Sequence, residues 1–233
     1  MKDYVFGSLK RWWVECRGVI YFFVLVVLPV KSVLADWNWV PTGSMNPTIL
    51  EGDMIFVNKA AYDLRVPFTM QRVTEWAQPE RGDIVVAFAP QDGTRVVKRV
   101  IGVPGDEIEM RNNVLTINGE RADYSELSAE VTAEMLPALR ERSVFAREDF
   151  GDGGHAVMSM RGVWSGRRNF EKVRVPEGEY FVMGDNRDNS LDSRVYGFME
   201  RERIVGKATG VIVSFDKLDR YQPRMGRFFS GLE

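Results

Sequence analysis

A serine within the segment PTGSMNPT (residues 41–48) has the setting of a nucleophile. Gly43 precedes Ser44, and glycine allows backbone conformations that present the next side chain in an unusual geometry. Pro41 and Pro47 stiffen the two flanks of the turn. Segments of this kind are more often ordinary loops, so a catalytic role for Ser44 requires a base elsewhere in the chain.

Two side chains could be that base. His155 is the only histidine, and its place beside the glycine-rich segment 151–154 is typical of a surface or packing residue. A neutral lysine is the alternative. Lys98 lies in a strand-like segment whose alternation puts Val96 and Val100 on its own face. Burial there would lower its pKa from about 10.4, and bringing the pKa near 8 would need roughly 3 kcal/mol of differential destabilisation, whereas a surface lysine would stay charged.

A third segment, GDNRDNSLDSR (184–194), combines turn-forming residues with opposite charges and could also be a solvated loop. A calcium loop of the EF-hand type is disfavoured, because Ser190 stands where glycine is needed and Arg187 stands at a ligand position. The Arg-Gly-Asp tripeptide at 81–83 is expected to open a strand rather than to serve as an adhesion motif.

Composition narrows the class of protein. The 31 Lys and Arg residues balance 33 Asp and Glu residues, and no long basic run favours nucleic acid as a partner. Cys16 is the only cysteine, which excludes an internal disulfide and zinc sites built on two or more cysteines. We therefore expect neither a metal nor another cofactor.

Short alternating segments separated by Gly, Asn, Asp and Pro predict an antiparallel β-barrel or sandwich rather than a parallel βαβ fold. The predicted strands are 53–58, 83–88, 95–103, 107–110, 114–117, 180–183 and 204–215, with a tight turn at Asn118-Gly119. Residues 125–142 have helical character limited by Pro137, and 155–160 could be a strand. We expect a mainly β fold, with an N-terminal transmembrane helix, a barrel-like catalytic domain and a small inserted α/β subdomain.

The interval 18–37 is long enough for a membrane span of roughly 20 residues, provided that Lys31 snorkels to the interface. Tryptophans flank it at positions 12, 13, 37 and 39. Positive charge precedes it, which predicts a cytoplasmic N-terminus and an external domain. Two alternatives are a cleaved signal peptide, since 33–35 resembles a cleavage site, and a buried core helix.

Together these segments resemble the bacterial type I signal peptidases, which are membrane-anchored serine–lysine endopeptidases. The resemblance rests on segments in the family's order: PTGSMNPT (41–48), GDMIFVNK (52–59), RGDIVV (81–86) with VKRVIGVPGD (97–106), and GDNRDNSLDSR (184–194). It covers 41–119 and roughly 178–215, whereas residues 120–175 match none of the family's motifs. Some relatives have two spans before the catalytic domain, and one is predicted here.

The resemblance implies roles for individual residues. Ser44 is the nucleophile, Lys98 is the general base, and Ser190 orients the lysine. The hydroxyl of Thr42 and the backbone N–H of Ser44 form the oxyanion hole. Many relatives carry serine at the position of Thr42, and threonine keeps the hydroxyl while restricting its rotamer. The supporting positions are Asp185, as a structural acid, and the charged pair Asp192 and Arg194.

The predicted organisation is a cytoplasmic N-terminus (1–17), a transmembrane signal anchor (18–37), a catalytic β core (38–119 and 176–216), an inserted subdomain (120–175) and a C-terminal tail (217–233). The resemblance implies removal of signal peptides from exported preproteins, bound as extended strands, at the outer (periplasmic) face of the cytoplasmic membrane. Three alternatives are a membrane-tethered, non-enzymatic β-domain that binds partners, a more specialised membrane-bound Ser/Lys processing peptidase, and a self-cleaving repressor of the SOS type. The repressor would need a DNA-binding helix-turn-helix where this chain has an apolar span.

Overall fold

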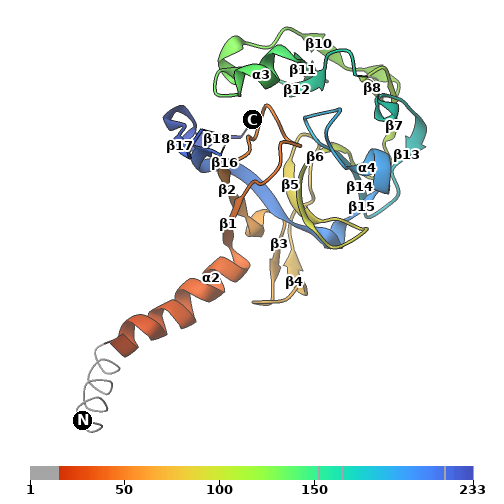
Figure 1. Ribbon diagram of the computed structural model, residues 1–233. Coiled ribbons are helices and arrows are strands. Elements are labelled where there is room, and N and C mark those ends of the chain that lie inside the picture. Colours follow the sequence, from red (N-terminus) through yellow and green to blue (C-terminus); the bar gives the residue numbers. More distant parts are fainter. Residues whose placement is uncertain (1–15, 152, 164, 218, 233) are drawn as a thin grey trace.

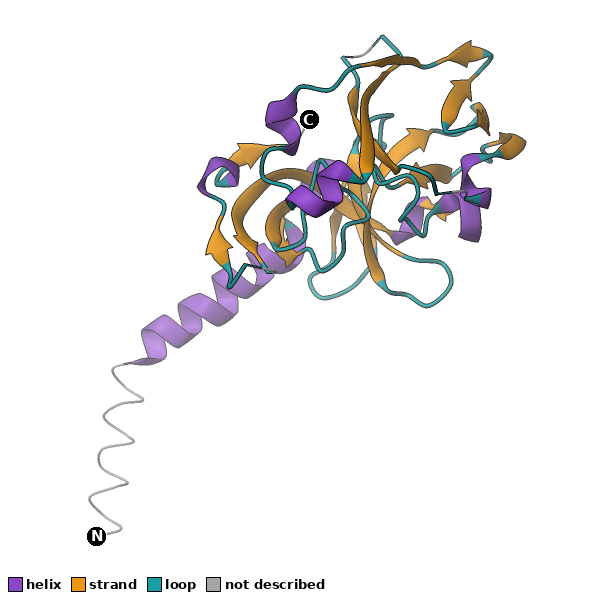
Figure 2. Cartoon of the chain, turned by 45° about the horizontal axis from the view of Figure 1, so that its top comes forward, coloured by secondary structure: helices purple, strands orange, loops and turns teal. Residues whose placement is uncertain are grey.

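The computed structural model describes residues 16–151, 153–163, 165–217 and 219–232. Most of the predicted N-terminus (1–17), including Trp12 and Trp13, lies outside the described residues. An apolar helix runs from Cys16 to Val33 and projects from the rest of the protein (Figures 1 and 2). It includes the π-helical stretch η1 (Phe23–Val27) and α2 (Leu28–Val33). Its 18 residues rise about 27 Å, so length and composition allow it to cross a bilayer core of about 30 Å.

The helix ends at Val33, and β1 (Ala35–Trp39) follows after one residue. Residues 35–37, the last of the predicted span (18–37), therefore belong to a strand, and every residue of β1 pairs with a residue of β2. The Lys59 ammonium donates to the carbonyl oxygens of Lys31 and Ser32 at 3.3 and 3.1 Å. These contacts satisfy carbonyl groups that a helix C-terminus leaves unpaired.

One antiparallel sheet forms the centre of the domain. Its order is β1-β2-β16-β5-β6-β14-β15, and β17 and β18 also pair with β16. Its strands are β1, β2 (Asp53–Asn58), β5 (Ile84–Phe88), β6 (Arg95–Gly102), β14 (Glu179–Met183), β15 (Met199–Glu200), β16 (Ile204–Asp216), β17 (Gln222–Pro223) and β18 (Ser230–Gly231). The mainly antiparallel β fold predicted from the sequence is confirmed.

The long strand β16 gives this sheet its curl (Figure 1). Its first part pairs with β5 and its second part with β2, and the register shifts within both pairings. Such bulges bend a strand and increase its twist. Gly206 sits where a Cβ atom would lie 2.5 Å from the carbonyl oxygen of Asn58, so only glycine permits this approach.

A second antiparallel sheet packs beside the first in the order β13-β7-β8-β9. Its strands are β7 (Glu107–Arg111), β8 (Val114–Ile117), β9 (Glu120–Arg121) and β13 (Phe170–Arg174). Asn118 and Gly119 both have positive φ angles, 53° and 83°. This is the tight turn predicted between two strands.

Residues 123–160 form a separate three-stranded sheet with short helices (Figure 1). Its elements are β10 (Asp123–Ser125), η3 (Ala129–Thr132), α3 (Pro137–Glu141), β11 (Ser143–Asp149) and β12 (His155–Met160). The helical stretch predicted at 125–142 is thus divided in two. Pro137 begins α3, where its missing N–H removes no helical hydrogen bond.

Small elements complete the described chain. They are the hairpin of β3 (Asp63–Arg65) and β4 (Arg72–Glu75), α4 (Ser193–Tyr196), and the 3-10 turns η2 (Lys59–Ala61), η4 (Gly166–Arg168), η5 (Arg201–Arg203) and η6 (Met225–Arg227). The amide N–H of Phe68, in the β3–β4 connection, donates to Ser32 Oγ at 2.6 Å. The hairpin therefore rests against the end of the apolar helix.

Candidate active site

The loop that carries Ser44 connects β1 to β2 and is anchored on both sides of the serine. Met45 and Ile49 are 1% and 0% exposed and pack into the core with Ile55 of β2. The Asn46 N–H donates to the Gly43 carbonyl oxygen at 3.2 Å, which closes the turn around Ser44. The buried neighbours fix the loop, so the Ser44 side chain is held in one place.

Lys98 faces Ser44 from the middle of β6. Its Nζ lies 2.9 Å from Ser44 Oγ and 2.9 Å from the carbonyl oxygen of Val97. The residue is only 4% exposed. Burial lowers the pKa of Lys98 to about 8, against the opposing charges of Asp192 and Asp185. Roughly a quarter of such lysines are neutral near pH 7.5, compared with about one in a thousand at the reference pKa.

A buried ion pair ties the segments of the site together. Arg99, next to Lys98, donates from Nε and a terminal nitrogen to the two Asp185 carboxylate oxygens at 3.0 and 2.9 Å. Thr48 Oγ1 donates to the same carboxylate at 2.5 Å. Although burial opposes it, the Arg99 guanidinium holds the pKa of Asp185 below its ordinary value. This ionised carboxylate joins β6, the Ser44 loop and the 184–194 loop.

A second buried pair shapes the 184–194 loop itself. Asp192 and Arg194 lie 2.7 Å apart with side chains 0% and 1% exposed. Asp192 also accepts from the Gly184 N–H at 3.0 Å, and Arg194 donates to the Arg187 carbonyl oxygen at 2.7 Å. The pair, near the end of the loop, therefore holds the backbone of its first four residues.

Asn186 is a contact residue that the sequence did not single out. Its backbone N–H donates to the Ser44 carbonyl oxygen at 3.1 Å, and its Nδ2 donates to the Gly43 carbonyl oxygen at 3.0 Å. Asn186 is 2% exposed. The only indication of its role in the sequence was its position between Asp185 and Arg187 in the matched segment 184–194.

Of the two residues predicted to assist the chemistry, Thr42 faces the cavity and Ser190 is buried. Thr42 is exposed and lines the same cavity as Ser44 and Lys98. The Ser44 backbone N–H has no hydrogen-bond partner within the described part of the chain. Ser190 is buried against Gly184, but its Oγ makes no hydrogen bond to Lys98 among the described residues, since Lys98 is engaged by Ser44 and Val97.

The cavity at the two central residues has a volume of about 750 Å³. Residues 39–44 and 95–98 line it from two sides. Strand β6 pairs with β14 only from Arg99 onward. The corresponding edge of residues 95–97 therefore has no paired strand in the described structure and faces the cavity as a groove.

His155 lies in β12 and lines no part of this groove. Its Nε2 is 3.5 Å from Glu148 Oε1. Burial lowers the pKa of His155 to about 4, and the nearby Arg99 guanidinium acts in the same direction. The ring is therefore neutral at pH 7 and packs within the third sheet.

We expect His155→Ala to keep kcat/KM within about twofold of the original enzyme, because removing a side chain away from the reacting atoms leaves transition-state contacts intact. Steady-state kinetics of peptide-bond cleavage measures this. A loss near the roughly 10⁴-fold seen when a triad member is removed, in a folded variant, would contradict it.

Gly184 is packed so closely that a methyl group would collide with two parts of the site. A Cβ there would contact the Ser44 carbonyl oxygen and the Ser190 side chain at less than normal separation. We expect Gly184→Ala to lower the free energy of unfolding by about 2 kcal/mol and kcat by about tenfold through displacement of the Ser44 loop. Gly166→Ala is the matched control, since a Cβ there meets nothing within 4 Å. Equal effects of the two changes in denaturant titration and kinetics would refute the prediction.

Comparisons of the sequence and the structure with known proteins identify signal peptidases as relatives of this chain. The family model for "Signal peptidase, peptidase S26" matches residues 11–213. Signal peptidase I of Buchnera aphidicola subsp. Schizaphis graminum is 31% identical over 235 residues, covering 87% of this chain and 75% of its own. Signal peptidase I of Pseudomonas fluorescens is 36% identical and covers 85% and 72%. Signal peptidase I of Rickettsia typhi is 36% identical and covers 80% and 75%. Among solved structures, a signal peptidase I from Enterococcus faecalis is 29% identical with a TM-score of 0.37, covering 57% of this chain and 97% of that chain.

Proposed function

This chain belongs to the signal peptidase family, peptidase S26, and is a serine endopeptidase that removes signal peptides; we propose that Ser44 is its nucleophile and Lys98 its general base. The observation that carries the proposal is the 2.9 Å contact between Lys98 Nζ and Ser44 Oγ. It lies in an environment that lowers the pKa of Lys98 to about 8. A buried neutral amine at hydrogen-bond distance is what a weak hydroxyl nucleophile requires.

In the first half of the reaction, neutral Lys98 accepts the Oγ proton as Ser44 attacks the scissile carbonyl carbon. The carbonyl oxygen becomes an oxyanion, and the free backbone N–H of Ser44 is placed to donate to it. The Thr42 hydroxyl is the proposed second donor. Donors held in advance where charge develops contribute about 3–4 kcal/mol each.

In the second half, the Lys98 ammonium gives its proton to the leaving amine, and the mature protein departs with a new N-terminus. Expulsion of the amine leaves an acyl-enzyme, and Lys98, neutral again, accepts a proton from the water that attacks it. Lys98 then returns this proton to Ser44 Oγ as the bond between the acyl carbon and Oγ breaks. The products are the signal peptide with a free carboxylate and regenerated Ser44. Asp185, Asp192 and Arg194 act by holding the loops and touch no reacting atom.

The substrate is proposed to bind as an added strand along residues 95–97. The free edge there supplies backbone hydrogen-bonding groups, as in other cases of strand addition. Met45 and Val86, both buried, form part of the groove near Ser44. Such a floor leaves room for small side chains just before the scissile bond.

The helix Cys16–Val33 is proposed to cross the cytoplasmic membrane once, with the N-terminus inside and the catalytic domain on the outer side. Trp37 and Trp39 are 46% and 54% exposed beside the end of the helix, as expected for aromatics at a membrane interface. The balance of positive charge before the span supports this orientation.

We expect the helix to stay attached as an anchor rather than to be removed. The intact mass of the membrane-extracted protein should equal that of a chain that includes residues 16–37. A mature N-terminus at Asp36 would show instead that the segment is a cleaved signal peptide.

Cleavage of a preprotein by the detergent-purified full chain tests the proposed function. The original enzyme should release the signal peptide at a single bond, identified by N-terminal sequencing, and Ser44→Ala should not. Ser125→Ala, at an exposed position in β10, is the matched control. Cleavage by Ser44→Ala, or none by either the original or the control enzyme, would reject the assignment.

A further inference from the structure

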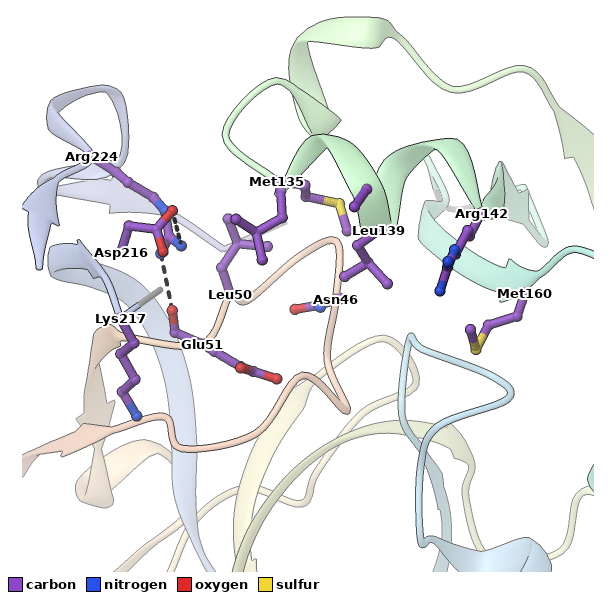
Figure 3. Close-up of a pocket in the computed structure, with 12 residues that line it drawn as sticks. Asn46, Leu50, Glu51, Met135, Leu139, Arg142, Met160, Asp216, Lys217 and Arg224 are labelled. Atoms are coloured by element: carbon purple, nitrogen blue, oxygen red, sulfur yellow. Dashed lines mark hydrogen bonds and ion pairs between the residues drawn. The ribbon is translucent and has the colours of Figure 1, made fainter. Parts of the chain in front are cut away.

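A second cavity, of about 330 Å³, lies on the other side of the Ser44 loop. Its walls come from that loop, from α3 and from the chain after β16 (Figure 3). Leu50, Met135 and Leu139 give it an apolar wall, and Asn46 lies among them. Ligand sites typically combine apolar walls with a few polar groups in cavities of about 300–1,000 Å³.

Asn46 is an unusual member of this wall. It is 5% exposed, and its Oδ1 has no hydrogen-bond partner among the described residues. A buried acceptor without a donor costs about 1–3 kcal/mol, so an N–H group from outside the chain would find a favourable partner here. In Figure 3 this oxygen lies on the side of the Asn46 amide that faces Leu50.

The cavity is a neighbour of the catalytic groove, since Glu51 lines both. The groove begins near Trp39, one strand from the apolar helix, whereas α3 lies at the far side of the domain from α2 (Figure 1). The apolar part of a signal peptide precedes the scissile bond and lies in the membrane. Residues after the bond must therefore leave Ser44 on the side away from α2, where this cavity lies.

We propose that this cavity binds the first residues of the mature protein, just after the scissile bond. The inference rests on the proposed function, because it takes Ser44 as the point of cleavage. Asn46 Oδ1 accepts a hydrogen bond from a backbone N–H of the departing segment. The wall of Leu50, Met135 and Leu139 receives an apolar side chain two to four residues beyond the bond, which makes this region a determinant of substrate preference.

The test uses the full chain in detergent with two synthetic substrates that are identical up to the scissile bond. The short substrate has one residue after the bond, and the long one has five, including a leucine in the third position. We expect kcat/KM for the long substrate to be about tenfold higher. Ala138→Trp, which fills the cavity from an exposed position on α3, should abolish this advantage and leave the short substrate unaffected. Ala133→Trp, also exposed but outside the cavity, should keep it.

The outcomes separate the two proposals. Equal cleavage of both substrates by the original enzyme would overturn the cavity inference while the Ser44–Lys98 assignment stands. Failure to cleave either substrate would overturn both. A physical readout needs no turnover: a photo-crosslinker at the third position after the bond, presented to Ser44→Ala, should label residues 135–142. Labelling confined to other segments would overturn the inference.

Discussion

Lys98→Arg is expected to abolish turnover, with a loss of about 10⁴-fold or more in kcat/KM, comparable to the removal of a member of a catalytic triad. Arginine keeps the positive charge but cannot lose its proton under these conditions, so it cannot accept the proton of Ser44. Lys172→Arg is the matched control, because Lys172 has a side chain 55% exposed on β13. Substantial activity in folded Lys98→Arg would show that the site needs a charge and not a proton acceptor.

The pH profile of the original enzyme tests the same role. Lys98 acts only when neutral, so kcat/KM should rise with pH up to about 8, the pKa of this lysine. Below that value the rate should fall about tenfold per pH unit. A profile that is flat between pH 5 and 8 would rule out a base with this pKa.

Lys98→Met removes both the proposed base and the buried charge, so its effects on activity and on stability should have opposite signs. The folded pKa of about 8 lies below the ordinary lysine pKa of 10.5, so the unfolded chain binds more protons between these values and stability rises with pH across that window. Below pH 8 the full cost of burying the ammonium remains. Lys98→Met should be inactive because it has no base. Its free energy of unfolding at neutral pH, measured by denaturant titration, should be about 3 kcal/mol higher because no ammonium is buried.

Thr42→Val is expected to lower kcat by about a hundredfold or more, and Thr42→Ser should keep most activity. Valine preserves the shape of threonine but removes the only group of this side chain that could donate to the oxyanion. KM should change little, because the hydroxyl acts on a charge that develops only in the transition state. Thr74→Val, at an exposed position in β4, controls for the substitution itself. Equal kcat for the Val and Thr forms would remove Thr42 from the oxyanion hole.

The strands that the sequence predicted best are those with uninterrupted alternation. Residues 53–58 coincide with β2, in which Ile55 and Val57 are fully buried and Phe56 is exposed. Strand β1 was missed because Trp37 and Trp39 continue the apolar character of the helix before them. Pairing with β2 decided their structure. The paired residues lie 15 or more positions apart in the sequence, so a local pattern cannot reveal the pairing. Strand β11 was missed for a related reason, because its charged residues gave no alternation to detect.

The proposed catalytic pair was predicted from four segments that match the family's motifs in order, whereas the glycine–serine turn and the lysine between valines alone left a loop and a surface lysine as alternatives. The buried charges that connect the pair were not predicted. Arg99 was included in the matched segment 97–106 without a role of its own, and the structure pairs it with Asp185. The predicted contact of Ser190 with Lys98 is not formed, since the lysine amine is directed to the Val97 carbonyl oxygen. Hydrogen-bond directions of this kind depend on backbone positions that no spacing of residue types specifies.

Only Leu34 separates the apolar helix from β1, and Lys59 bonds to the last turn of that helix from the adjoining strand. A domain joined to its helix in this way has no flexible linker that would let it rotate relative to the helix. With the helix in the bilayer as proposed, Ser44 stays at one height above the lipid, and enzyme and substrate meet by lateral diffusion in a plane. A preprotein whose scissile bond lies above or below that height cannot be reached by bending of the enzyme. With the helix placed as proposed, this mounting would select substrates by the distance from the membrane to the scissile bond as well as by the side chains beside that bond.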